Sequence, residues 1–336
     1  MALLSPSFTK TVTLSTVAVL SLGAVGQAAY AGTLNGAGAS FPAPLYQRYF
    51  ADYKAQTGTT VNYNSVGSGA GIRQFIGETV DFGASDAPLT DKDKSQMKRG
   101  VITVPTAGGA VAVVYNLAGK KVQLSRDVLP KIFMGQITNW NQVDPKLPSK
   151  PIRVVVRADG SGTTEIFTSH LATISSDFKS KVGANKEPNW GFQVLKGPKN
   201  DGVAALVKQT DGAIGYVQDT YARKNEGPTM QTAKVQNKAG QYVEPSLAQA
   251  NKAIANAKFD ANFVADVNDP PSGYPIVGIT WLLVYKDYKD PGTAKDMKAL
   301  INWIMTKGQA INPQLEFTQI PAAVTKKVIA EVNKIK

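Results

Sequence analysis

The segment Arg157–Thr164 constrains the fold most, because small polar residues there separate a strand-like run from a helix-like run. A mostly apolar, β-branched run, Ile152–Val156, precedes it, and apolar residues recur at helical spacing over 166–172. A strand-to-helix turn leaves backbone N–H groups unpaired at the positive end of the helix dipole. Together with the hydroxyl groups of the turn and the guanidinium of Arg157, these N–H groups predict an anion site. The alternative is a capped helix beside a surface arginine.

Three further expected strands in the first hundred residues are also followed by small polar residues. The expected strands are a brief one from Thr33, then Thr60–Tyr63 and Val80–Ala84, and their turns are Gly36–Pro44, Gly67–Gly71 and Ser85–Pro88. Helical patterns follow the first two turns at Leu45–Gln56, which should end at Gly58, and at Ile72–Ile76. This alternation predicts an open α/β sheet, in which ligands bind beyond the carboxyl ends of the strands.

Two long apolar runs predict where the chain passes between two domains. The first is Val101–Tyr115, which Pro105 and the pair Gly108–Gly109 interrupt, and the second is Pro275–Tyr285. We interpret them as the outward and return crossings. Domain I is then discontinuous and comprises residues 32–106 and 278–336, whereas domain II comprises residues 107–277.

The remaining chain gives weaker patterns. Residues 222–273 are polar and carry little periodicity apart from one helical stretch. The other expected elements are a short helix at Leu129–Met134, a polar loop at Ile137–Asn141 that holds Trp140, a capped helix from Asp201, a strand at Gly212–Val217, and helices at Leu247–Ala257, Ala294–Thr306 and Ala322–Ile335.

The N-terminus has the pattern of a secretion signal. Lys10 is the only charged residue among the first 31, an apolar stretch runs from Val12 to Val25, and Ala29-Tyr30-Ala31 matches a cleavage site. Serine and threonine interrupt the apolar stretch, which is short for a membrane span. We expect residues 1–31 to be removed, which would leave the protein free in the periplasm or outside the cell. The chain has no cysteine, which excludes disulfides and a lipid-modified cysteine anchor.

The net charge of +12 comes from 37 basic and 25 acidic residues. The basic residues are scattered, and no stripe of them alternates with aromatic residues, so we expect no nucleic-acid partner. The densest group is Lys92, Lys94, Lys98 and Arg99, which Asp91 and Asp93 dilute. It is predicted to be a solvated face. The excess charge indicates only a general attraction for anions.

The residues available for catalysis are few. His170 is the only histidine and is interpreted as a packing residue. Because the chain has this one histidine and no cysteine, we exclude the usual zinc clusters and the Ser/His and Cys/His nucleophile systems. The glycine-rich nucleotide motifs are also absent. We therefore predict no cofactor, no metal and no enzymatic activity, although a carboxylate-pair enzyme stays open. Asp86 and Asp159 are the only acids at the glycine and serine turns.

Several spaced motifs of the chain resemble those of the phosphate-binding proteins of bacterial high-affinity phosphate ABC transporters. The resemblance covers essentially the whole chain after residue 31. The motifs are Gly36–Pro44, the turn at Ser68, Val80–Pro88, Arg157–Thr163 and Asp211–Val217. It implies a two-domain periplasmic binding protein of type 2, with mixed sheets, helices on both faces and the ligand in the interdomain cleft. It also implies a monomer that closes about hinges near residues 105–109 and 276–279 and passes phosphate to permease subunits in the inner membrane.

The resemblance also implies the ligand contacts. Carried over to this sequence, the phosphate-binding positions are Ser40, Phe41, Ser68, Asp86, Arg157, Ser161, Gly162 and Thr163. Phe41 and Gly162 would act through backbone N–H groups. Ser40 stands where the family often has threonine, and Ser68-Gly69 stands where a pair of serines is common.

Selectivity for phosphate is expected to depend on Asp86. Phosphate keeps a proton near neutral pH and can donate it to a buried carboxylate, whereas sulfate has none and is repelled. Asp159 is expected to orient Arg157, and the alternative for Asp86 is a helix cap or Asx-turn before Pro88. Three other functions stay open at this point: a secreted phosphate-ester hydrolase or phosphoryl-transfer enzyme, a binding protein for another oxyanion, and a phosphate sensor without a transport role.

Overall fold

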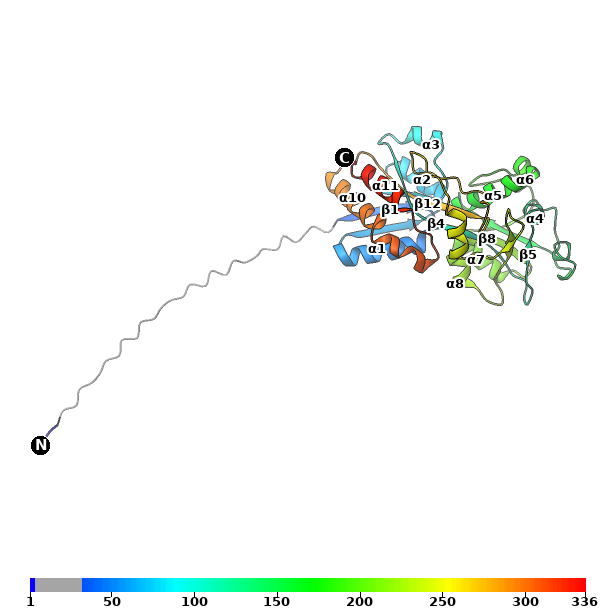
Figure 1. The fold of residues 1–336 in the computed structure, drawn as a ribbon, viewed down its shortest axis with the longest axis horizontal. Coiled ribbons are helices and arrows are strands. Elements are labelled where there is room, and N and C mark those ends of the chain that lie inside the picture. Colours follow the sequence, from blue (N-terminus) through cyan, green and yellow to red (C-terminus); the bar gives the residue numbers. More distant parts are fainter. Residues whose placement is uncertain (4–31) are drawn as a thin grey trace. The chain divides into compact units, whose positions relative to one another are not determined.

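The computed structural model describes residues 1–3 and 32–336, so the expected signal peptide lies outside the described residues apart from its first three. No helix within the described ranges is long and apolar enough to cross a membrane. The described chain from residue 32 onward forms mixed sheets surrounded by helices (Figure 1).

The larger sheet contains nine strands of the described chain. Their order is β2 (Thr60–Ser65), β1 (Thr33–Gly38), β3 (Phe82–Ser85), β12 (Val277–Val284), β4 (Ile102–Tyr115), β8 (Ala213–Gln218), β6 (Arg153–Arg157) and β7 (Leu195–Gly197), with β9 (Gln231–Thr232) beside β4. A small sheet joins β11 (Tyr242–Val243), β10 (Lys234–Gln236) and β5 (Gln123–Leu124). Strands β1, β2 and β3 are parallel, as are β6, β7 and β8, whereas β12 and β4 are antiparallel to their neighbours.

Strand β4 connects the two ends of the large sheet. Its residues 102–110 pair with β12, and its residues 111–115 pair with β8. The expected break at Pro105 and Gly108–Gly109 is wrong, because β4 is continuous. The register instead shifts between Thr280 and Trp281 of β12, and this irregularity leaves Thr106 unmatched beside Pro105. The two apolar runs of the sequence are thus adjacent, hydrogen-bonded strands.

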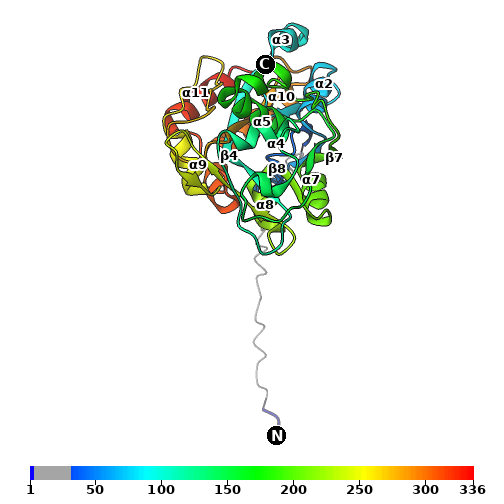
Figure 2. The same ribbon diagram turned by 90° about the vertical axis from the view of Figure 1, so that its right-hand side faces the viewer.

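The helices form two groups (Figure 1). Beside β1–β3 lie α1 (Ala43–Thr57), α2 (Ser68–Ile76), α3 (Asp91–Gln96), α10 (Pro291–Met305) and α11 (Ala322–Val332). At the other end lie α4 (Val128–Phe133), α5 (Gly162–Ile174), α6 (Ser176–Lys181), α7 (Lys199–Gln209) and α8 (Asp219–Asn225), while α9 (Leu247–Ile254) packs on β4 and β12. Short 3₁₀ turns are η1 (Trp140–Gln142), η2 (Gly308–Ala310) and η3 (Asn312–Leu315). Figure 2 shows that helices surround the central strands.

Local sequence signals account for many of these boundaries. Helix α1 ends where Gly58 adopts a left-handed conformation, as its position predicted. Helix α10 begins after Asp290, whose carboxylate accepts a hydrogen bond from the backbone N–H of Thr293. Helix α2 begins already at Ser68, so most of the expected turn Gly67–Gly71 is its first helical turn.

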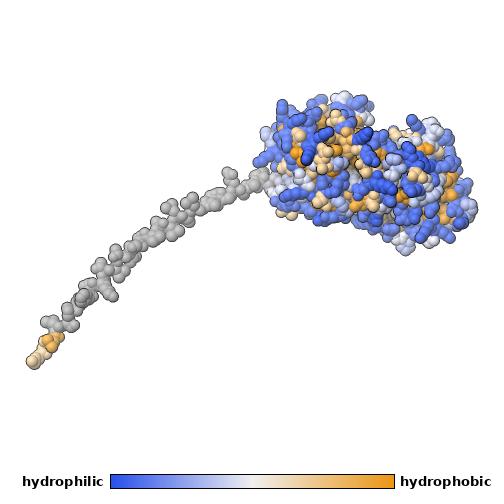
Figure 3. All heavy atoms as spheres, viewed as in Figure 1, coloured by the Kyte–Doolittle hydropathy of each residue, from blue (hydrophilic) through white to orange (hydrophobic). Residues whose placement is uncertain are grey.

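Two expectations about single side chains are corrected. Trp140 does not lie in a polar loop: it is fully buried in η1, and its indole N–H donates to the carbonyl of Gly212 at 3.0 Å. Arg99 is not part of a solvated face, because its guanidinium carbon lies 4.4 Å above the ring centroid of Tyr285. On the face that Figure 3 shows, hydrophilic residues predominate, and beyond residue 3 the exposed large apolar side chains in the described chain are Leu195 and Tyr242.

Candidate anion-binding site

The polar residues singled out in the sequence meet beyond the carboxyl ends of the strands. Ser40 follows β1, Ser68 begins the helix after β2, Asp86 follows β3, and Arg157 ends β6. All four are buried, with exposed fractions of 1%, 1%, 3% and 6%. Strands β1–β3 are parallel and present their carboxyl ends together. Strand β6 runs antiparallel to them through β12, β4 and β8, and the turn after it meets theirs, as the contact between Gly162 and Ser68 shows.

Ser68 connects the two groups of elements. Its Oγ accepts hydrogen bonds from the backbone N–H groups of Asp86 at 3.2 Å and of Gly162 at 3.1 Å, and it lies 3.5 Å from Asp86 Oδ2. A Cβ atom added to Gly162 would lie 2.5 Å from Ser68 Oγ and 2.6 Å from the Cβ of Asp86. Only glycine fits between these two residues, so the start of α5 can approach α2 closely.

Arg157 is held by a neighbouring carboxylate. Its Nε donates to Asp159 Oδ1 at 3.0 Å, and its Nη2 donates to Oδ2 at 2.5 Å. The third nitrogen, Nη1, donates to Thr163 Oγ1 at 3.2 Å. The Arg157 side chain is only 1% exposed, so this two-point pairing both compensates its buried charge and fixes the plane of the guanidinium.

The N-terminus of α5 supplies the free backbone donors that the turn predicted. Ser161 caps the helix, because its Oγ accepts from the N–H of Thr164 at 3.0 Å. The backbone N–H of Thr163 makes no hydrogen bond to any residue that the structure describes, and the same is true of Phe41. The ring of Phe41 is fully buried against Phe317, with centroids 5.8 Å apart, and this packing fixes its backbone.

Burial raises the pKa of Asp86 to about 7, although hydrogen bonds from Thr280 and Ser68 and the charge of Arg157 oppose this rise. Thr280 donates from Oγ1 to Asp86 Oδ1 at 2.7 Å. The alternative of a helix cap or Asx-turn at Asp86 is wrong, because Ser85 makes the local turn by bonding to the backbone of Ala87. The carboxyl group of Asp86 is therefore directed to long-range partners.

Sequence reasoning missed two residues of this cluster. Thr280 lies inside an apolar strand, where no motif marks it. Asn200 is fully buried near the start of α7, and its Nδ2 donates to Ser40 Oγ at 2.8 Å and to Thr163 Oγ1 at 3.3 Å. The available signal was a polar residue directly before a predicted helix, which usually indicates a cap.

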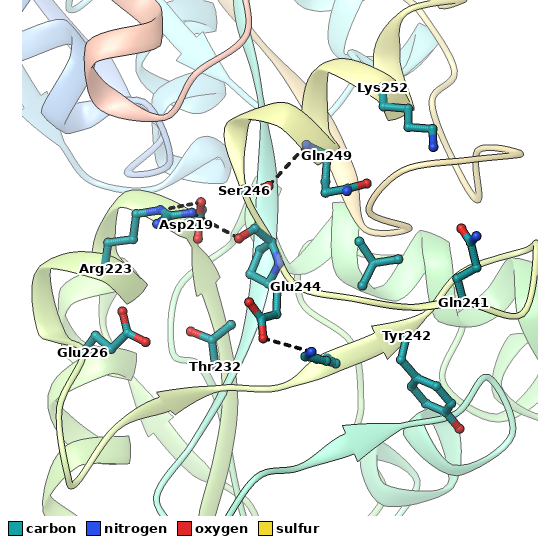
Figure 4. Close-up of a pocket in the computed structure, with 13 residues that line it drawn as sticks. Asp219, Arg223, Glu226, Thr232, Gln241, Tyr242, Glu244, Ser246, Gln249 and Lys252 are labelled. Atoms are coloured by element: carbon teal, nitrogen blue, oxygen red, sulfur yellow. Dashed lines mark hydrogen bonds and ion pairs between the residues drawn. The ribbon is translucent and has the colours of Figure 1, made fainter.

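One cavity borders this cluster, and a larger hollow lies apart from it. A cavity of about 180 Å³ touches Asp86, and Glu165, Ser169 and Trp281 are among its lining residues. A larger hollow of about 860 Å³ lies among α8, β11 and α9 (Figure 4). Its ion pairs, Arg223 with Asp219 and Lys234 with Glu244, compensate one another. The acidic side chains Asp219, Glu226 and Glu244 in the lining of this second hollow disfavour an oxyanion there.

Within the described ranges, no group of three or more His, Cys, Asp or Glu side chains could hold a metal ion. His170 is buried in α5, and burial lowers its pKa to about 4. Its Nδ1 lies 3.9 Å from Asp269, and neither ring nitrogen has a hydrogen-bond partner in the described chain. This environment agrees with the packing role expected from the sequence.

A family model described as the PBP superfamily domain matches residues 23–307. The chain is 37% identical over 320 residues to the phosphate-binding protein PstS of Haemophilus influenzae, covering 91% of this chain and 94% of that protein. It is 32% identical to the phosphate-binding protein PstS of Methanocaldococcus jannaschii, covering 89% and 85% of the two chains. The chain belongs to the PstS family.

Solved structures with the same fold carry corresponding names. One is a high-affinity periplasmic phosphate-binding protein, PfluDING, bound with phosphate, with a TM-score of 0.78, 24% identity, and coverage of 89% of this chain and 93% of that chain. Another is a phosphate-binding protein from Stenotrophomonas maltophilia, with a TM-score of 0.74, 22% identity, and coverage of 89% and 94%. The fold is thus the two-domain α/β fold of the PstS family, as the sequence predicted.

Proposed function

We propose that the protein binds inorganic phosphate in the buried cluster between β1–β3 and α5. The observation that best supports this is the convergence of one guanidinium, several hydroxyls and unpaired backbone N–H groups around a single carboxyl group. A tetrahedral oxyanion needs many donors from several directions, and this cluster supplies them in a site shielded from water. The proposed contacts are Ser40, Phe41, Ser68, Asp86, Arg157, Ser161, Gly162 and Thr163.

In this proposal Asp86 selects for a protonated oxyanion. With a pKa of about 7, its carboxyl group can share one proton with phosphate near neutral pH. The proton can reside on the ligand or on Asp86, because either arrangement places one hydrogen between two oxygens. Fully ionised sulfate brings no such proton, so above pH 7 it would face the bare carboxylate.

We also propose that two lobes close on the ligand. Domain I would comprise residues 32–106 and 278–336, and domain II residues 107–277. The contacts that opening would break include Ser68 Oγ with the N–H of Gly162, and the N–H of Gly69 with the carbonyl of Gly160 at 2.9 Å. Strands β4 and β12 run between the lobes and would carry the hinges near residues 105–109 and 276–279.

The cellular role follows from the same proposal. The protein would act as a monomer in the periplasm after removal of residues 1–31, and it would deliver phosphate to the permease subunits of an ABC transporter. It would have no enzymatic activity. The relatives named phosphate-binding protein PstS support this role.

Calorimetric titration of the purified protein with phosphate, arsenate and sulfate tests the binding step. We expect one tight phosphate site per chain and much weaker sulfate binding at pH 8. Sulfate binding as tight as phosphate binding would contradict the proposal, and so would the absence of phosphate binding. Release of phosphate from a chromogenic ester, with and without divalent metal, would instead support an enzyme. Phosphate uptake by a deletion strain separates a transport component from a sensor.

A further inference from the structure

We infer that Asn200 is a positioning residue that turns the hydroxyl protons of Ser40 and Thr163 toward the bound anion. This inference rests on the proposed phosphate-binding function and adds a residue to it. Asn200 is fully buried, and it contacts both hydroxyl groups without being a proposed ligand contact itself. The two hydroxyls come from different parts of the fold, one beyond β1 and the other in the first turn of α5.

The orientation of the Asn200 amide is fixed by a backbone donor. Its Oδ1 accepts a hydrogen bond from the N–H of Gln218 at 2.9 Å. A flipped amide would place Nδ2 against this N–H group, with two donors facing each other. Nδ2 must therefore face the hydroxyl groups, and each of its two hydrogens has one hydroxyl oxygen to meet.

The acceptor capacity of Ser40 is used up by Asn200. Its Oγ accepts from Asn200 Nδ2 at 2.8 Å and from the backbone N–H of Asn200 at 3.3 Å. A hydroxyl group has two acceptor positions and one donor hydrogen. With both acceptor positions occupied, the Ser40 hydroxyl can only donate, and it does so away from Asn200.

Thr163 is constrained in the same way from another direction. Its Oγ1 accepts from Arg157 Nη1 at 3.2 Å and from Asn200 Nδ2 at 3.3 Å. Its hydroxyl hydrogen must therefore also be donated to a third group. Asn200 thus converts two hydroxyls, which could act as donors or acceptors, into obligatory donors.

Preset donors favour an anion in two ways. As the proposed lobes close, Asn200 holds both hydroxyls as donors toward the ligand, and the two O–H dipoles add positive potential to the site. A ligand group that needs an acceptor finds none at these two positions. Asn200 therefore contributes to affinity for oxyanions through Ser40 and Thr163, and its effect should disappear when both hydroxyls are absent.

A mutant cycle tests this dependence by phosphate calorimetry. Asn200→Ala in the otherwise unchanged protein should weaken phosphate binding about tenfold or more. The same substitution in a Ser40→Ala, Thr163→Val background should change affinity by less than about twofold. Equal fold-changes in the two backgrounds would overturn the inference. If the unsubstituted protein did not bind phosphate at all, the proposed function would be overturned instead.

A second variant reverses the polarity of the amide. In Asn200→Asp, an ionised carboxylate would accept from both hydroxyls and draw their hydrogens away from the anion. The ratio of variant to unchanged Kd should be largest at high pH and should narrow as pH falls and the new carboxyl group gains a proton. A ratio that is constant with pH would overturn the inference.

A matched control removes another buried amide away from the site. Asn116 is buried, and its Nδ2 donates to the carbonyls of Val207 and Lys208. Asn116→Ala should lower the thermal unfolding midpoint without changing phosphate affinity. A comparable loss of affinity in this control would show that the Asn200 effect is one of general destabilisation, and would overturn the inference.

Discussion

Thr280 Oγ1 donates a hydrogen bond of 2.7 Å to Asp86 Oδ1, although 194 residues separate the two in sequence. Thr280 lies in the strand that carries the return crossing, directly at the register shift beside β4. The bond occupies one carboxyl oxygen of Asp86 and leaves the other toward Ser68. The residue proposed to select the ligand is therefore oriented by a strand proposed to act as a hinge.

Thr280→Val should test this orientation, because it removes the hydroxyl and keeps the branched shape. The bond from Thr280 lowers the pKa of Asp86, so its loss should raise that pKa further. Phosphate affinity should fall by roughly 1 kcal/mol, the usual net value of one hydrogen bond. Calorimetry at pH 8 measures the loss, and Thr280→Ser, which keeps the hydroxyl, should restore most of it. Unchanged binding in the valine variant would contradict the assigned role.

Asp86→Asn should weaken phosphate binding by roughly 1.5–3 kcal/mol, because a hydrogen-bond partner of the anion is replaced. It should also relax the rejection of sulfate, since the buried charge that repels a fully ionised anion is gone. Competition titration of both anions at pH 8 measures the selectivity ratio. An unchanged ratio would count against Asp86 as the selecting residue.

The stability of the ligand-free protein should depend on pH through Asp86. Its pKa is about 7 when folded and 3.8 when hydrated, so between these values the folded protein holds a proton that the unfolded chain has lost. The free energy of unfolding should therefore fall as pH rises through this window, by about 1.4 kcal/mol per unit and by at most about 4 kcal/mol in all. Denaturant unfolding of the protein and of Asp86→Asn isolates this contribution. A difference in the free energy of unfolding between the two proteins that does not vary with pH would contradict this prediction.

His170 should contribute with the opposite sign. Burial lowers its pKa from 6.5 to about 4, and the partly opposing charge of Asp269 does not reverse this. Between these values the unfolded chain binds the extra proton, so the free energy of unfolding should rise with pH, by about 3 kcal/mol at most. His170→Gln should remove this rise. Comparing how the free energy of unfolding of this variant and of Asp86→Asn varies with pH separates the two contributions, which have opposite signs and partly cancel below pH 6.5.

Gly162→Ala should interfere with closure more than with folding. Its new Cβ would lie 2.5–2.6 Å from Ser68 Oγ and the Cβ of Asp86, which belong to the opposite proposed lobe. An open arrangement relieves this clash, so thermal stability without ligand should change little while phosphate affinity falls at least tenfold, or by about 1.4 kcal/mol. Small-angle scattering with excess phosphate should show no compaction. Unimpaired compaction and binding would contradict both the contact and the lobe division.

Many elements follow from local sequence alone. The turn at Arg157–Thr164 lies between β6 and α5 because β-branched residues favour strands, whereas Ser161 caps the helix that follows. Gly58 ends α1 because glycine tolerates the left-handed conformation that closes a helix. In such cases the deciding interaction joins residues within a few positions of each other, so the sequence contains the whole signal.

The polar cluster itself depends on contacts between residues that are far apart in the sequence. The motifs led to Ser40, Ser68, Asp86 and Arg157, but they gave no indication of Thr280, because a single threonine in an otherwise apolar run is ordinary for a buried strand. The expected break in the first apolar run was also wrong, because pairing of β4 with β12 outweighs the local preference of proline and glycine to interrupt a strand.

Short-range spacing in the sequence predicts the alternation of strands and helices and the polar turns, whereas the expected site residues came from the resemblance to the phosphate-binding proteins. Three features became apparent from the three-dimensional structure: β4 is continuous, Asn200 contacts Ser40 and Thr163, and Asp86 is buried deeply enough to raise its pKa. Hydrogen-bond saturation and desolvation depend on which distant groups surround an atom, and one local stretch of sequence does not specify those groups.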